Sequence, residues 1–188
     1  MKKISACLAI VFLVVACSWR SPNSEFYVMN RGDLQAISNK KISVAVAKVK
    51  VPDMLDRAQM VVSDEGSNQI RILEFQRWGD VYPDILQNAV TNDLIAYLPN
   101  AYVKRTYFDG ENVMYSVNIE VNQLMAYPGY KVVLSAWWNI KDAKGNIIRR
   151  EQGSYEAKVE GNEIKDLVVA QSKAVHQMSQ EIAAALVK

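Results

Sequence analysis

The sequence predicts an α+β fold, a predominantly antiparallel twisted sheet with two amphipathic helices packed on one face. Two observations support this prediction. Apolar residues recur at every second position in residues 113–121 and again in residues 130–140, which is typical of strands with one buried face, whereas residues 80–98 and 164–188 follow a helical period. The elements follow one another as strands, helix, strands, helix, so the two helices can cover the same face of the sheet.

The first seventeen residues have the pattern of a bacterial signal peptide that ends at a lipidated cysteine. Lys2 and Lys3 precede an apolar run at residues 4–16, which is too short to span a bilayer as a helix. Small Ala16 stands directly before Cys17, and this pair resembles a bacterial lipobox. We therefore expect residues 1–16 to be removed and Cys17 to receive S-diacylglycerol and an N-acyl chain such as palmitate. The alternative is an ordinary signal peptide with an incidental cysteine.

Lipidation would decide where the mature chain resides. Three acyl chains make an effectively permanent anchor, because each buried CH₂ contributes about 0.8 kcal/mol. Ser18 is not the aspartate that typically retains a lipoprotein at the inner membrane, so we expect the periplasmic face of a Gram-negative outer membrane. Residues 17–24 then form a polar, lipidated tether, and residues 25–188 form a single domain.

Composition excludes several classes of function. Removal of Lys2 and Lys3 leaves a formally neutral chain without a Lys/Arg-rich run, so we expect no nucleic-acid partner. Cys7 is removed with the signal and Cys17 is lipidated, so no thiol remains for a disulfide or a cysteine nucleophile. We expect no second membrane segment after Cys17 and no cofactor other than the covalent lipid.

The first half of the domain is expected to contain short strands followed by a helix. Residues 25–30 begin the folded part, and residues 42–51 are apolar on both faces, which favours a central strand ended by Pro52. A hairpin is expected over residues 60–73. The helix over residues 80–98 has its apolar residues at three- and four-residue spacing, with Asp80 as a plausible N-cap.

The second half is expected to supply the longest strands and the last helix. Strands are expected at residues 102–108, 113–121, 130–140 and 147–159. Residues 113–121 alternate most regularly, with valine, tyrosine and isoleucine on one face and polar side chains on the other. The second face of the sheet is therefore expected to meet water or a partner.

Several segments, taken in order, resemble a known family. They are residues 49–55, Trp78 shortly before a helix that ends at residues 94–99, and residues 130–138, which lead to the turn at Gly145. Their order and spacing are similar to those of the PqiC/YmbA-type auxiliary lipoproteins of ABC-type transport. This likeness runs from about Phe26 to the last helix.

The resemblance implies membership of a paraquat-inducible intermembrane transport system. In such systems MCE-domain proteins bridge the periplasm, and the lipoprotein is the outer-membrane partner. The resemblance thus implies a non-enzymatic docking or tethering subunit, lipid cargo, a homo-oligomer and a role in envelope integrity. Alternatives are a periplasmic carrier of lipid or another apolar ligand and, with less support, an envelope hydrolase.

Candidate site residues are sparse. His176 is the only histidine, and without cysteine a zinc site around it would need several carboxylates, so we expect it to pack at a boundary and we expect no metal or catalytic site. Adjacent Trp137 and Trp138 must point to opposite faces of their strand. Trp138 belongs to the core, whereas Trp137 either forms a contact surface or is covered by a neighbouring element.

A second candidate surface is the loop after the strand over residues 42–51. Pro52 makes a rigid bend there, and we expect Leu55, Asp56 and Arg57 to be exposed behind it as a docking loop. Pro52, Leu55, Asp56 and Arg57 together with Trp137 are therefore the predicted partner-binding residues.

Overall fold

The structure is a computed structural model that describes residues 22–106 and 112–188. The signal segment, Cys17 and the last residues of the predicted 102–108 strand lie outside the described residues. The strands are β1 (Glu25–Tyr27), β2 (Ser43–Val46), β3 (Gln59–Ser63), β4 (Ile70–Trp78), β5 (Tyr102–Arg105), β6 (Tyr115–Tyr127), β7 (Lys131–Asp142) and β8 (Ile147–Lys158). The helices are a single 3₁₀ turn, η1 (Asp53–Leu55), and two α-helices, α2 (Tyr82–Tyr97) and α3 (Ile164–Val187).

The predicted α+β class is confirmed, but the strands divide between two sheets instead of forming one. The larger sheet has the order β5-β2-β6-β7-β8 and the smaller one β1-β4-β3. The long ladders β6–β7 and β7–β8 are antiparallel, as is β3–β4, whereas β2 runs parallel to both of its neighbours. Because β5 and β6 occupy both edges of β2, the β3–β4 hairpin has no edge of β2 to join and packs beside β6.

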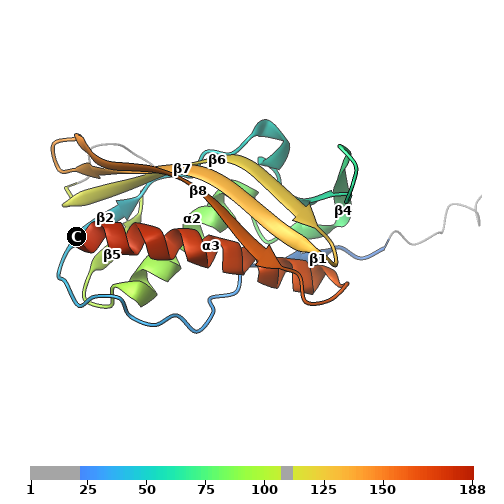
Figure 1. The fold of residues 1–188 in the computed structure, drawn as a ribbon, viewed down its shortest axis with the longest axis horizontal. Coiled ribbons are helices and arrows are strands. Elements are labelled where there is room, and N and C mark those ends of the chain that lie inside the picture. The colour runs from blue at the N-terminus through green and yellow to red at the C-terminus, as the bar shows by residue number, and fades with distance from the viewer. Residues whose placement is uncertain (1–21, 107–111) are drawn as a thin grey trace, which may run out of the picture.

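Both α-helices lie on the same face of the five-stranded sheet and pack against each other (Figure 1). α3 runs along β7 and β8, and α2 lies over β2 and β5. The layer between helices and sheet is filled by buried side chains from both α-helices and from β2, β6, β7 and β8. Among them are Val44, Val46, Leu86, Leu94, Val117, Leu134, Met178 and Ile182. Of the residues that the structure describes, none forms an α-helix over the opposite face of the same sheet (Figure 1).

The two helices begin in different ways. The expected N-cap at Asp80 is wrong, since Val81 is the N-cap residue and the Asp80 carboxylate instead accepts a hydrogen bond from the Val81 N–H at 2.8 Å. Pro83 in the first turn has no N–H that would need an acceptor, and the helix starts without a side-chain cap. α3 begins with a reciprocal capping box between Glu163 and Asp166.

A buried glutamine joins α2 to the five-stranded sheet. Gln87 is fully buried, and its Nε2 donates to the carbonyl oxygens of Val46 at 2.9 Å and Thr106 at 3.0 Å. These two carbonyls lie at the ends of neighbouring strands β2 and β5. Since buried carbonyls without a donor are costly, this side chain sets the position of α2 over the sheet.

A polar chain also crosses the core between sheet and α3. The Trp138 Nε1–H donates to the Tyr155 hydroxyl at 3.1 Å, and that hydroxyl donates to Glu181 Oε2 at 2.7 Å. Burial and the bond to Glu181 raise the pKa of Tyr155, so its hydroxyl stays a donor at neutral pH. Gly153 leaves the room for this ring, because a Cβ at that position would overlap the tyrosine hydroxyl oxygen.

The ladder of β2 is shorter than the predicted strand over residues 42–51. Regular pairing ends at Val46, but the chain continues beside β6, where the Lys50 N–H donates to the Ile119 carbonyl at 3.0 Å and the Lys50 carbonyl accepts from Val121 at 2.8 Å. This segment therefore stays attached to the sheet as far as Lys50. It places the side chains of Lys48 and Lys50 at the rim of the uncovered face.

Candidate functional site

The uncovered face of the five-stranded sheet is built by the outward residues of β6, β7 and β8. The strand register places Glu120 opposite Trp137, and Trp137 opposite Gln152. One pair further along, Asn118, Asn139 and Arg150 stand in the next row. Because successive side chains alternate between faces, the neighbours of these residues along each strand point into the helix-covered core.

The two adjacent tryptophans show this alternation directly. Trp138 is 2 % exposed in the core, and Trp137 is 43 % exposed on the uncovered face. The question left open by the sequence is thereby answered for the described part of the chain, in which no neighbouring element covers the Trp137 indole. An exposed indole on a sheet face is a common anchor in protein contacts, because it offers a large, rigid apolar surface.

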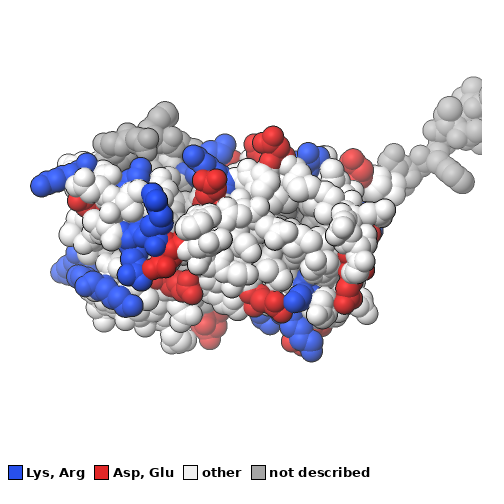
Figure 2. Space-filling model, turned by 45° about the horizontal axis from the view of Figure 1, so that its top comes forward, with Lys and Arg blue, Asp and Glu red and all other residues white. Residues whose placement is uncertain are grey.

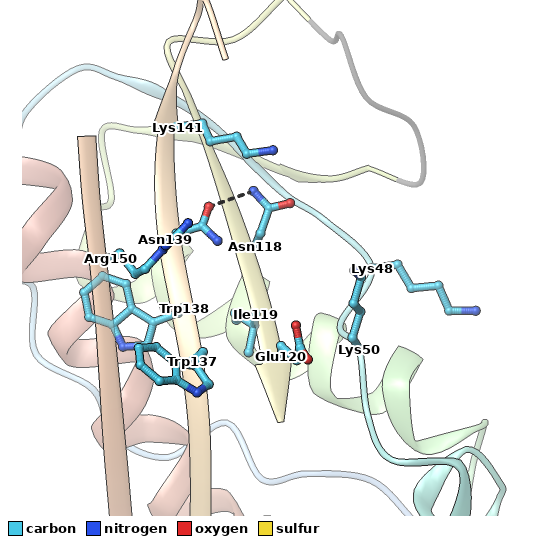
Figure 3. A pocket seen from close by; sticks show the side chains of 10 residues that line it. All are labelled: Lys48, Lys50, Asn118, Ile119, Glu120, Trp137, Trp138, Asn139, Lys141 and Arg150. Atoms are coloured by element: carbon cyan, nitrogen blue, oxygen red, sulfur yellow. Dashed lines mark hydrogen bonds between the residues drawn. The ribbon is translucent and has the colours of Figure 1, made fainter. Parts of the chain in front are cut away.

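Trp137 lies in a hollow of about 410 Å³, which we call the Trp137 groove (Figure 3). Its basic members come from two sides, with Lys48 and Lys50 after β2 and Lys141 and Arg150 on β7 and β8. Its other principal members are Glu120, Trp137 and the amides Asn118 and Asn139. The Asn118 Nδ2 lies 3.5 Å from the Asn139 Oδ1, which is a long hydrogen bond, so both amides keep capacity to bind a ligand.

The electrostatics of the groove favour an anion. Within the described residues, none of its four basic side chains has a carboxylate at salt-bridge distance, and Glu120 is its one acidic member. Figure 2 shows Lys and Arg gathered toward the left end of this face, where the β7–β8 turn lies in Figure 1, beside a largely uncharged centre. Positive charge without a partner in a hollow raises the local concentration of anionic ligands.

A second hollow of about 720 Å³ adjoins the groove. The two share Lys48, Lys50 and Glu120, and the second is also lined by Pro52 and Asp56. The fold therefore brings part of the predicted docking loop onto the same surface as Trp137. No property of the sequence alone joined these two candidates, because they are more than eighty residues apart.

The expected exposure of Leu55 is wrong. The η1 turn directs Leu55 into the core, where it is 4 % exposed, and Met54 faces outward in its place at 39 %. Arg57 is partly buried, and its carbonyl accepts a hydrogen bond from the Tyr82 N–H at 3.1 Å. In a 3₁₀ turn consecutive side chains point in directions about a third of a circle apart. Met54 and Leu55 therefore face different ways, and Leu55 is the one that the turn directs into the core. Pro52 and Asp56, but not Leu55, remain at the hollow.

His176 has a partner that the sequence analysis missed. Its Nδ1 lies 2.8 Å from Oδ2 of Asp93, which is 1 % exposed on α2, so this pair links the two helices. The segment at Gly32 passes close to the other ring nitrogen, since a Cβ there would lie 3.0 Å from Nε2. A helical spacing that puts Asp93 toward the core was the available signal.

The pair has the chemistry of a structural contact. Among the described residues, Asp93 is the one hydrogen-bond partner of the imidazole, and no group of three or more His, Cys, Asp or Glu side chains is placed to hold a metal ion. In those residues there is also no helix long and apolar enough for a membrane crossing. A carboxylate and an imidazole without a hydroxyl partner do not form a nucleophile–base set.

Comparison with known proteins gives a family and a fold. The model of a family described as the ABC-type transport auxiliary lipoprotein component matches residues 30–183. No curated protein matches the chain. The solved structure of an uncharacterized protein is 20 % identical, covers 88 % of this chain and 99 % of its own, and superposes with a TM-score of 0.71. A protein from Xanthomonas campestris is 11 % identical, with coverages of 85 % and 92 % and a TM-score of 0.68. Because both identities are low, these two comparisons establish a shared fold and nothing about function.

Proposed function

Because this chain belongs to the family of ABC-type transport auxiliary lipoprotein components, we propose that it is a non-enzymatic docking subunit of an intermembrane transport complex. In the proposal it is of the PqiC/YmbA type and holds the end of an MCE-domain periplasmic bridge at the outer membrane. The cargo of such a complex is lipid, and its transport sustains envelope integrity. The lipid on Cys17 anchors the subunit to the periplasmic face, and the folded domain binds the bridge.

The observation that best supports docking is the contrast between a filled core and an open, hollowed sheet face. The helix-covered side is closed by fully buried side chains such as Leu134 and Met178. The other side presents Trp137 beside four basic side chains that have no carboxylate at salt-bridge distance within the described residues. An exposed aromatic residue surrounded by polar and charged groups has the composition of a protein-binding surface.

The alternative of a lipid carrier has less support. A carrier with this fold would hold an apolar ligand between sheet and helices, and in the described residues that layer is occupied by side chains such as Leu86, Leu94 and Ile182. Organic extraction of the purified lipoprotein, followed by mass spectrometry, tests this alternative. Noncovalent lipid in stoichiometric amount would favour the carrier, and its absence the docking subunit.

Anchoring is tested by the Cys17→Ser variant. We expect the variant to leave the outer-membrane fraction, because it can receive no diacylglycerol, and we expect mass analysis of the wild-type N-terminus to find a triacylated cysteine. An Ala16→Gly variant serves as the matched control, since it keeps both the small residue and the thiol. Outer-membrane fractionation of Cys17→Ser would contradict the anchoring proposal.

Docking is tested by photo-crosslinking in cells from the position of Trp137. The control position is Val169, which is exposed to a similar extent, at 38 %, on the outer side of α3. We expect the MCE-domain protein to be captured from Trp137 and not from Val169. Capture only of a second copy of this chain would instead assign the face to the homo-oligomer, and capture from neither position would contradict docking by this face.

A further inference from the structure

The arrangement of charges in the Trp137 groove narrows the chemistry of its occupant. Lys48, Lys50 and Arg150 are exposed, and Lys141 is partly exposed, so all four ammonium and guanidinium groups can meet a ligand. None has a carboxylate at salt-bridge distance within the described residues, and Glu120 is the one acidic member of the groove among them, so positive charge remains in excess there. A bound partner with carboxylates would supply the missing negative charge.

The four cations surround the groove and do not converge on one point. Figure 3 shows Lys141 at one end of the groove, Lys48 on one side and Arg150 on the other. Trp137 lies toward the end of the groove that is away from Lys141. A single phosphate is normally bound by several donors aimed at the same position. Charges spread around a hollow suit an elongated ligand that bears several acidic groups along its length.

The remaining members of the groove suit a peptide. The amides of Asn118 and Asn139 offer both N–H donors and carbonyl acceptors, which complement the two polar groups of a peptide unit. Glu120 stands next to Trp137 and repels carboxylates from that end. The ligand must therefore place an apolar group over the indole and its acidic groups toward Lys141, Arg150 and the two lysines after β2.

We propose that the Trp137 groove binds an extended acidic segment of the periplasmic partner. This inference rests on the proposed docking function. One aromatic or aliphatic side chain of the segment covers the Trp137 indole, and Asp or Glu residues of the segment pair with Lys48, Lys50, Lys141 and Arg150. The indole gives contact area, and the cations give orientation and a fast association rate. The attraction weakens as salt is added, because these charges are exposed.

The test uses the full lipidated protein in a nonionic detergent. The probe is a fluorescein-labelled peptide in which Glu residues flank one Phe, compared with a peptide that has Lys in place of each Glu, and binding is followed by fluorescence anisotropy. The groove variant is Lys50→Glu/Arg150→Glu. The matched control is Arg31→Glu/Lys173→Glu, which changes the net charge equally at two exposed positions outside the groove.

We expect the acidic peptide to bind in a salt-dependent manner and the basic peptide not to bind. The groove variant should weaken binding at least tenfold, and the control variant less than twofold. Equal weakening by both variants, or binding of both peptides alike, would overturn the proposal. A short-chain phosphatidylglycerol, used below its micelle concentration, tests the other anionic occupant. Three results together would overturn the peptide in favour of an acidic lipid: the lipid binds, the groove variant abolishes its binding, and the peptide does not bind.

The failure of this inference can be told apart from the failure of docking. Crosslinking from the Trp137 position is repeated in cells that carry Lys50→Glu/Arg150→Glu. Loss of the captured partner supports the acidic segment. Undiminished capture leaves docking in place and overturns the acidic segment, whereas absence of capture in the wild-type background overturns docking itself.

Discussion

The two faces of the five-stranded sheet are made by the same strands but obey different demands. On the face covered by α2 and α3, the side chains of Leu134, Ala136 and Trp138 are buried in the hydrophobic core. On the other face, Ser135, Trp137 and Asn139 alternate with them and remain at least partly exposed. Neighbouring residues on one strand thus serve stability and recognition separately, because alternation assigns each side chain to one face.

The adjacent tryptophans offer the strongest test of this comparison. Trp138→Ala should lower the free energy of unfolding by about 3–5 kcal/mol, because it empties a buried site and removes the donor to the Tyr155 hydroxyl. Trp137→Ala, the matched change one residue earlier, should lower it by less than about 1 kcal/mol. Urea denaturation of both variants measures the difference, and similar losses would mean that the uncovered face is also part of the stabilising core.

Two amides extend the comparison to polar side chains. Gln87→Ala should cost about 2–4 kcal/mol in the free energy of unfolding, since it leaves the Val46 and Thr106 carbonyls without this donor and opens a cavity. Asn139→Ala on the uncovered face should change stability by less than about 0.5 kcal/mol. Both values follow from urea denaturation, and a neutral Gln87 variant would show that α2 is positioned by apolar packing alone.

Two small residues on β8 test the space on each side. Gly153→Ala should destabilise the protein by about 1–3 kcal/mol, because the added methyl group would displace the Tyr155 ring from its bonds to Trp138 and Glu181. Ser154→Ala, on the next residue and the opposite face, should be nearly neutral. Thermal denaturation compares them. An unchanged melting temperature for Gly153→Ala would mean that the ring moves without cost.

The smallest effect on stability is expected at the β7–β8 turn, which belongs to neither face of the sheet. Hydrogen bonds from the Asn146 side chain and backbone, with a further one from the Lys144 N–H, lower the pKa of Asp142 below 3.8. The folded pKa is thus below the unfolded one, so this stabilisation is present above the unfolded pKa and is lost as pH falls through the folded pKa. Asp142→Asn should therefore lower the melting temperature slightly at pH 7.

The same difference should shrink at an acidic pH below the folded pKa of Asp142, where the wild-type carboxyl is protonated. Asn146→Ala, which removes the main partner of Asp142, should reproduce both results. A melting-temperature difference that is the same at the two pH values would show that the turn geometry, and not the charge of Asp142, is what Asn146 stabilises.

Local patterns were enough to predict the classes of the elements. The alternation through β6 and β7 predicted two strands with one buried face, and Trp138 in the core was confirmed. The helical periods predicted α2 and α3 to within a few residues. These properties depend only on the spacing of side chains along one segment, so they can be predicted from the sequence of that segment alone.

Relations between distant segments required the tertiary structure. The division into two sheets depends on which strand edges are already occupied, the pairing of His176 with Asp93 on how α3 crosses α2, and the burial of Leu55 on the direction of one short turn. The groove likewise exists only because the chain after β2 lies beside β6 and brings Lys48 and Lys50 next to Trp137. The sequence by itself determined the apolar period of each element, whereas long-range packing decided which residues share a surface, since that choice minimises the free energy of the whole chain and not of any segment.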